Sequence, residues 1–189
     1  MRIVAGTWRG RTLVAPTGSR TRPTADRVRQ ALFDMLLHAP WGGRDTVEGA
    51  RVLDVFAGTG AFGLEALSRG ATHATFIEHD AAALAALSAN IAALHADRFC
   101  TVFPADALAV PSGQKCDLVF LDPPYGDDLV RRALLRLRDA GWIASAAMIV
   151  AETGRDEPPP VTHLLAERIH GAARITIWRE GSIEGEPAA

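Results

Sequence analysis

A glycine-rich turn near residue 58 most constrains how this chain can fold. The turn, Gly58 to Gly63, follows an apolar run at 51–56 and opens a helix-like segment at 61–69. Strand–turn–helix units of this kind build parallel sheets, because each helix returns the chain to the same edge. The pattern predicts an α/β fold with a mostly parallel sheet. Further strands are predicted at 74–78, 99–103, 117–121, 148–152, 163–169 and 173–179, the last two as an antiparallel hairpin, and further helices at 24–38, from about 80 to 94, and at 128–140.

The glycine turn also predicts a bound adenosine-like cofactor. It matches G-x-G-x-x-G, and Glu78 lies twenty residues after Gly58, where a carboxylate can accept hydrogen bonds from both ribose hydroxyls. Asp54, four residues before Gly58, would repel a pyrophosphate and attract a cationic amino-acid end. Asp106, after the third strand, suits an adenine amino group, or serves only as a cap or turn residue. These acids favour S-adenosylmethionine over NAD. The predicted cofactor residues are Asp54, Phe56, Ala57, Gly58, Thr59, Gly60, Gly63, Glu78 and Asp106.

A second motif ends the fourth predicted strand. The apolar run reaches Leu121 and stops at Asp122, Pro123, Pro124 and Tyr125, the only tyrosine of the chain. Two prolines cannot continue a strand or enter a helix interior, so the chain must leave the sheet in a stiff turn. A carboxylate, free carbonyls and an aromatic ring there suit a planar amino group such as that of a nucleobase. The alternatives are a helix cap for Asp122 and local packing for Tyr125.

Charge is distributed unevenly along the chain. Residues 1–40 hold seven arginines against two aspartates, a net charge of +5, and the remainder holds 13 basic and 20 acidic residues, a net charge of −7. A basic segment on an acidic body favours a polyanionic partner, although surface arginines on a solvated helix would give the same pattern. The segment is predicted to form a small hairpin from 2–5 and 11–14, then a helix capped by Thr24. The residues predicted to contact this polyanion, as a nucleic acid, are Arg9, Arg11, Arg22, Thr24 and Arg29.

Composition limits the remaining possibilities. A chain of 189 residues with 48% hydrophobic content forms one domain with a real core. We expect a cytoplasmic monomer, because there is no signal-peptide core and no apolar run near the roughly 20 residues of a membrane span. Cys100 and Cys116 are expected to be reduced core thiols. The six histidines lack ligand spacing, so no metal site is predicted.

The motifs together resemble a known family. Asp54-Val-Phe-Ala-Gly-Thr-Gly60, Glu78 and Asp122-Pro-Pro-Tyr125 resemble class I methyltransferases that modify exocyclic amino groups. Three further segments narrow the resemblance to the bacterial 16S ribosomal RNA guanine-N2 methyltransferase D family, over residues 2 to about 178. These segments are Arg22-Pro23-Thr24, Arg29-Gln-Ala-Leu-Phe33 and Gly63-Leu-Glu-Ala-Leu-Ser-Arg-Gly-Ala71.

The resemblance implies a fold and a reaction. The implied fold is the Rossmann-like, seven-stranded methyltransferase sheet with helices on both faces, here extended by the N-terminal hairpin and helix. Residues 1–40 would form the RNA-contacting arm, 41–180 the methyltransferase domain and 181–189 a disordered tail. S-adenosylmethionine would methylate N2 of one guanine of 16S rRNA in the small ribosomal subunit. Asp122 and the Pro123 carbonyl would accept hydrogen bonds from that amino group, and Tyr125 would stack on the base.

Three rival functions stay open at this point. An adenine-N6 nucleic-acid methyltransferase would use the same Asp122 chemistry, although 189 residues leave little room for the target-recognition region of a DNA enzyme. An NAD-dependent oxidoreductase would use the glycine turn, but the residues from Asp122 to Tyr125 would then have no function. A non-catalytic RNA-binding module could keep a relic cofactor pocket, although the intact acids at 54, 78 and 122 speak against it.

Overall fold

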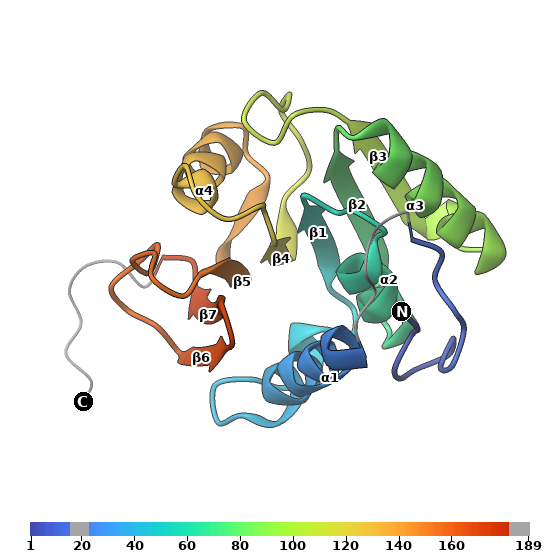
Figure 1. Ribbon diagram of the computed structural model, residues 1–189, viewed down its shortest axis with the longest axis horizontal. Helices are drawn as coiled ribbons and strands as arrows, with labels where there is room; N and C mark the ends of the chain where they lie inside the picture. The colour runs from blue at the N-terminus through green and yellow to red at the C-terminus, as the bar shows by residue number, and fades with distance from the viewer. Residues whose placement is uncertain (16–22, 182–189) are drawn as a thin grey trace.

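The computed structural model describes residues 1–15 and 23–181, which fold around one seven-stranded sheet in the order β3-β2-β1-β4-β5-β7-β6 (Figure 1). All neighbouring strands are parallel except the pairs β5–β7 and β6–β7. This confirms the predicted α/β sheet and its C-terminal antiparallel hairpin. The strands are β1 (Arg51–Val55), β2 (His73–Glu78), β3 (Cys100–Pro104), β4 (Cys116–Leu121), β5 (Ile143–Gly154), β6 (Ala166–His170) and β7 (Ala173–Arg179).

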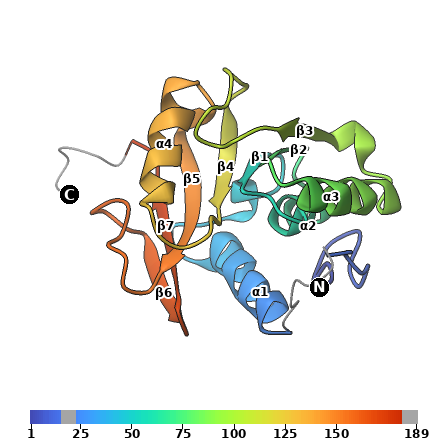
Figure 2. The ribbon, with the colours of Figure 1, turned by 45° about the horizontal axis from the view of Figure 1, so that its top comes forward.

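Helices cover both faces of the sheet (Figures 1 and 2). Along β4 the side chains alternate between two cores, with Leu118 and Phe120 on one face and Val119 and Leu121 on the other. The first face packs against α1, α2 and α3, and the second packs against α4. The helices are α1 (Pro23–His38), α2 (Ala61–Ser68), α3 (Ala81–Ala93) and α4 (Leu129–Asp139), with short 3-10 turns η1 (Arg44–Thr46) and η2 (Asp97–Phe99).

The N-terminal segment is part of the main core. Ile3 and Leu13 are buried in the same cluster as Leu32 and Phe33 of α1 and Phe120 of β4. The predicted hairpin of 2–5 and 11–14 was wrong in extent, because only one antiparallel bridge forms, between residues 2 and 12. Several neighbouring backbone N–H groups instead donate hydrogen bonds to side chains of α2 and α3.

These backbone contacts fix the segment closely. Glu65 accepts hydrogen bonds from the N–H groups of Val4 and Ala5 at 2.8 and 3.0 Å, and the Ser68 hydroxyl accepts one from Trp8 N–H at 2.9 Å. Asn90 exchanges two hydrogen bonds with the backbone of Val14. The chain from 1 to 15 therefore lies on α2 and α3 and does not project as a free arm.

Some predicted boundaries were wrong. Helix α1 begins at Pro23, so Thr24 lies inside the first turn and is not the cap residue. Strand β5 begins five residues before the predicted start at Met148, after an irregularity in its pairing with β4. Arg22 and the last eight residues of the predicted tail lie outside the described residues. None of the helices in the described part of the chain has the length and apolar character to cross a membrane.

Candidate active site

Three predicted acids meet at one edge of the sheet. Asp54 lies near the end of β1, Glu78 ends β2 and Asp122 follows β4. Because β1 pairs with both β2 and β4 in parallel, the carboxyl ends of these three strands are neighbours. The chain order reverses between β1 and β4, and ligands of open α/β sheets bind at such a reversal.

Two of the three motif glycines are required by packing. A Cβ on Gly60 would lie 2.4 Å from Leu87 Cδ1, and a Cβ on Gly63 would lie 2.4 Å from Phe76 Cε1. Gly58 differs, because a Cβ there would meet almost nothing, although its φ of +55° lies in the left-handed region, as the φ of +78° at Gly60 does. Packing thus accounts for Gly60 and Gly63, and Gly58 is where a ligand could approach the backbone.

Glu78 is held rigidly beside this turn. Its Oε2 accepts a hydrogen bond from Gly58 N–H at 2.9 Å, and its Oε1 accepts from His79 and Asp80 N–H at 2.7 and 2.8 Å. The residue is buried, and Oε2, which accepts only one of these three hydrogen bonds, keeps a lone pair for a further donor. The side chain is therefore set in advance to receive hydroxyl groups at the strand end.

Asp54 is a buried carboxylate, and no arginine, lysine or histidine within residues 1–15 and 23–181 forms an ion pair with it. Its Oδ2 accepts one hydrogen bond, from Gly63 N–H at 2.9 Å. The pKa of this carboxyl is raised from 3.8 to about 8, chiefly by burial and also by the nearby carboxylates of Asp122 and Glu78, while the Gly63 hydrogen bond opposes the rise. A cationic ligand at this edge would favour the ionised form.

The other predicted cofactor residues lie around this turn. Phe56 has a φ of 59°, unusual for a bulky residue, and directs the chain out of β1. Ala57 is held by a hydrogen bond from its N–H to Ile77 O, and the Thr59 carbonyl accepts one from Asn90. Asp106 is exposed after β3, and its Oδ1 accepts from Leu108 N–H at 2.9 Å, as a turn residue does. A role for Asp106 toward adenine stays a prediction.

The turn after β4 presents its acid and its ring to solvent. Asp122 cannot cap the next helix, because α4 begins only at Leu129. Tyr125 is 51% exposed, so a face of its ring is available, and its hydroxyl donates to Glu152 Oε1 at 2.7 Å. Pro123 is buried, whereas Pro124 is exposed.

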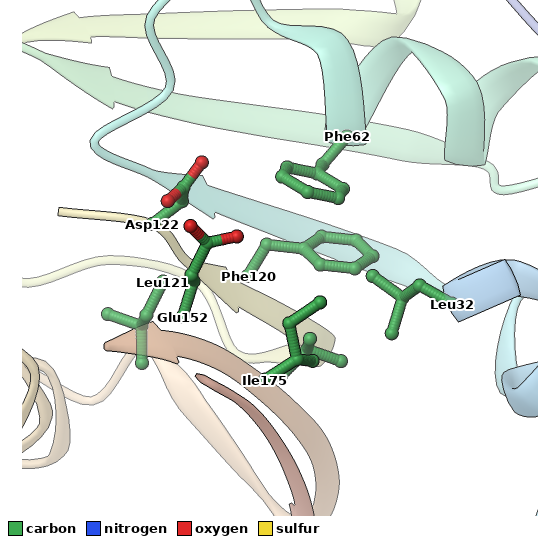
Figure 3. A pocket seen from close by; sticks show the side chains of 8 residues that line it. Leu32, Phe62, Phe120, Leu121, Asp122, Glu152 and Ile175 are labelled. Carbon is green, nitrogen blue, oxygen red and sulfur yellow. The ribbon is translucent and has the colours of Figure 1, made fainter. Parts of the chain in front are cut away.

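A pocket lies directly beside Asp122 (Figure 3). The carboxylates of Asp122 and Glu152 lie next to each other at one end of it. The Phe62 and Phe120 rings stack beside them, with centroids 5.0 Å apart. Crowding by protein atoms and the charge of Glu152 raise the pKa of Asp122 to about 7, although the residue is exposed at the pocket mouth. The pocket is lined by Leu32, Phe62, Phe120, Leu121, Asp122, Val150, Glu152 and Ile175.

Sequence reasoning missed Glu152, Phe62 and Leu32 as site residues. Glu152 carried a usable signal, since it is an acid at the end of an apolar strand, as Asp54 and Glu78 are. Phe62 occupies an unspecified position of the glycine motif, and Leu32 belongs to a helix distant in sequence. Only the fold brings these two to the pocket.

The prediction of Arg29 as a phosphate-binding residue was wrong. Arg29 is only 2% exposed. Its guanidinium contacts Asp26 at 3.0 Å and Glu65 at 3.4 Å, and it donates to the Arg2 carbonyl. Glu65 is fully buried and also pairs with Arg69 at 2.8 Å. The arginine balances a buried carboxylate and has no surface left for phosphate.

Arg9 and Arg11 are exposed but lie away from the pocket. The turn that carries Arg9 is bonded to Ser68, at the far end of α2 from the glycine turn, and a helix of eight residues spans about 12 Å. Arg11 donates to Ala93 O, at the last residue of α3. These two arginines could therefore contact a bound polyanion only at positions distant from the group that reacts in the pocket.

Comparison with known proteins identifies the family. A family model described as "Conserved hypothetical protein 95" matches residues 1–179. Ribosomal RNA small subunit methyltransferase D of Escherichia coli strain K12 is 37% identical, over 100% of this chain and 94% of the relative. The chain belongs to this methyltransferase D family. The putative rRNA methyltransferase YlbH of Bacillus subtilis is 34% identical over 95% of the chain and 99% of its own length.

A solved structure agrees with membership of the methyltransferase D family. The putative methyltransferase yhhF from Escherichia coli superposes with a TM-score of 0.82 at 38% identity, covering 95% of this chain and 97% of that one. The class I methyltransferase fold expected from the sequence is thereby confirmed. An NAD-dependent oxidoreductase is excluded, because the match runs through the glycine turn and the Asp122 turn alike.

Proposed function

We propose that this protein transfers a methyl group from S-adenosylmethionine to the exocyclic N2 of one guanine in 16S rRNA of the small ribosomal subunit. Membership of the methyltransferase D family supports methyl transfer to ribosomal RNA. The observation that carries the proposal is the placement of Asp122, with a raised pKa and an adjacent pocket, beside the glycine turn and Asp54.

The residues at the sheet edge fit S-adenosylmethionine. Glu78, fixed by three backbone N–H groups, would receive the ribose hydroxyls, and Gly58 leaves room for the adenosine to approach. Asp54 would hold the cationic amino-acid end, which explains a buried carboxylate that has no ion-pair partner in the described part of the chain. When bound, this cofactor supplies the methyl group, since its S–CH3 bond breaks as the N–CH3 bond forms and a neutral thioether leaves.

The protein's own groups would activate the amino nitrogen. Its lone pair is conjugated with the base, so the free amino group is a weak nucleophile. Hydrogen bonds to Asp122 and to the Pro123 carbonyl would make the nitrogen more tetrahedral, and both would strengthen as it becomes positive. A carboxylate with a pKa of about 7 can then take the proton that the methylated nitrogen releases.

The base would have to leave any helix to reach Asp122. The half-exposed Tyr125 ring offers it a stacking partner, as in other enzymes that act on flipped bases. Arg9 and Arg11 would contact phosphates further along the RNA. We expect the protein to act as a monomer in the cytoplasm, where ribosomal subunits assemble.

The test is methyl transfer with identification of the product. The purified protein is incubated with tritiated S-adenosylmethionine and either naked 16S rRNA or small subunits from cells lacking the corresponding methyltransferase. The RNA is digested to nucleosides, and the labelled one is identified by mass spectrometry. We expect N2-methylguanosine at a single site. N6-methyladenosine as the product would favour the rival base, and no transfer to either substrate would contradict the proposal.

A further inference from the structure

We propose that Glu152 selects guanine, by accepting a hydrogen bond from the ring N1–H while Asp122 accepts from the neighbouring N2 amino group. This inference rests on the proposed function and names the residue that determines its base specificity. Asp122 alone cannot determine the specificity, because adenine and cytosine, like guanine, carry an exocyclic amino group that can donate a hydrogen bond to a carboxylate.

The sheet places the two carboxylates side by side. Strands β4 and β5 are parallel, with Phe120 opposite Val150 and Leu121 opposite Ala151. The next pair in this register is Asp122 and Glu152. Side chains alternate along strands, so both acids project to the face of Phe120, and neighbouring strands lie about 4.8 Å apart. Figure 3 shows the two carboxylates adjacent at the same end of the pocket.

Two adjacent acceptors match the edge of only one common base. An ionised carboxylate can accept hydrogen bonds and cannot donate them. Guanine presents two donors in sequence, N1–H and the N2 amino group. Adenine and cytosine present an amino group beside an unprotonated ring nitrogen. The lone pair of that nitrogen would face a lone pair of the second carboxylate, and the two acceptors would repel each other. A site that leaves a buried polar group unmatched rejects the wrong substrate by up to about 10⁴-fold.

Glu152 has an oxygen available for this contact. Its Oε1 accepts from the Tyr125 hydroxyl at 2.7 Å, which fixes the orientation of the carboxylate. Within residues 1–15 and 23–181, no hydrogen bond reaches its Oε2. The carboxylate is half-buried at the rim of the pocket, where a base bound at Asp122 would meet it.

A simpler role for Glu152 would be to hold Tyr125 in place. The two roles predict different effects of the Tyr125→Phe and Glu152→Gln variants on base preference. If Glu152 acts only through Tyr125, then Tyr125→Phe and Glu152→Gln weaken all substrates alike. If Glu152 contacts N1–H, only Glu152→Gln changes which base is preferred, because the glutamine oxygen still accepts from Tyr125 while its NH2 group can face a bare ring nitrogen.

The experiment compares guanine with 2-aminopurine at the methylated position. 2-Aminopurine keeps the N2 amino group but has an unprotonated N1. The position is first located with the wild-type protein, and 16S rRNA carrying either base there is prepared by ligation. We expect the wild type to prefer guanine by about 100-fold in kcat/KM, and Glu152→Gln to reduce this preference by about the same factor. Tyr125→Phe should slow both substrates equally.

A pH profile at saturating cofactor gives a second readout. Among the described residues, the titratable groups that interact with Asp122 are Asp54 from β1, Glu152 from β5 and Tyr125 of the same turn. Asp122 must be ionised to take the proton that the methylated nitrogen releases, so the wild-type rate should fall as pH drops below about 7. Removing the charge of Glu152 lowers the pKa of Asp122, so the Glu152→Gln profile should shift to lower pH. Tyr125→Phe should keep the wild-type midpoint.

The outcomes separate this inference from the function on which it rests. If the wild type forms no N2-methylguanosine, the proposed function fails. If the wild type forms N2-methylguanosine but methylates 2-aminopurine with the same kcat/KM as guanine, Glu152 does not select the base. This outcome can be observed with the wild-type protein alone. Equal loss on both substrates in Glu152→Gln and Tyr125→Phe also overturns the inference. Thermal unfolding and S-adenosylhomocysteine affinity, expected to match the wild type, confirm that the variants are folded.

Discussion

At the scale of single residues, this site concentrates acidic side chains, and no cation of the described residues forms an ion pair with Asp54, Asp122 or Glu152. Asp54, Glu78 and Asp122 meet at one sheet edge, and Glu152 adds a fourth acid. Burial above all, together with the neighbouring acids, raises the pKa values of Asp54 and Asp122 to about 8 and about 7. Perturbed acids of this kind cluster at functional sites, where a ligand provides the missing partner.

Replacement of Asp54 by asparagine should separate stability from cofactor binding. A carboxyl with a raised pKa stabilises the fold while protonated, and this contribution is present below pH 3.8 and lost as pH rises through about 8. Asp54→Asn keeps an oxygen for Gly63 N–H and carries no charge. Relative to the wild type it should therefore gain stability between pH 4 and 8.

Binding of S-adenosylhomocysteine, which keeps the cationic amino group, should weaken in Asp54→Asn by about 10–100-fold. Chemical denaturation across pH and calorimetric titration measure the two effects. Asp45→Asn, an exposed acid before β1, is the matched control and should change neither. Unchanged affinity in Asp54→Asn would show that Asp54 does not hold the cofactor.

At the scale of elements, the N-terminal helix is attached by a buried ion network. Arg29 of α1 and Arg69, directly after α2, flank Glu65, which also receives the backbone of residues 4 and 5. The sequence could not show that Arg29 is buried, because its burial depends on a carboxylate 36 positions away. Strand and helix order, in contrast, followed from local apolar patterns and glycine turns.

Removing one member of this network should destabilise the whole protein. Arg29→Ala leaves Glu65 buried with less compensation, and breaking such a group costs about 3–5 kcal/mol. Arg27→Ala, on the exposed side of the same helix, should cost about 0.5 kcal/mol or less. Urea unfolding measures both values. Equal stability of the two variants would contradict the assignment of Arg29 to the interior network.

At the scale of the whole molecule, sheet order decides which residues form the site. The alternation of strands and helices predicted the sheet, but the neighbour of β4 on each side depends on how the chain crosses over. Because β5 and not β3 lies next to β4, Glu152 joins Asp122, while Asp106 after β3 lies three strands from it. The glycine and Asp122 motifs could therefore be predicted from the sequence, whereas the pocket, which is formed by several elements, could not.

RNA binding should depend on the exposed arginines of the N-terminal segment. Reversing charge at both Arg9 and Arg11 should lower affinity for 16S rRNA and reduce the slope of log K against log salt by about 1 for each lost phosphate contact. Arg44→Glu is the control, since this exposed arginine lies outside the basic N-terminal segment of residues 1–40. Filter binding over a salt series measures the slopes. Identical slopes for Arg9→Glu/Arg11→Glu and the wild type would exclude this segment as an RNA contact.

The measurement that tests the central claim most directly is single-turnover methyl transfer by the Asp122→Ala variant. The account assigns to Asp122 the hydrogen bond that activates the amino nitrogen, and loss of such a group lowers the rate by about 10²–10⁴-fold. Affinity for S-adenosylhomocysteine should remain close to that of the wild type, because Asp54 and Glu78 are intact. Transfer at the wild-type rate in Asp122→Ala would contradict the account.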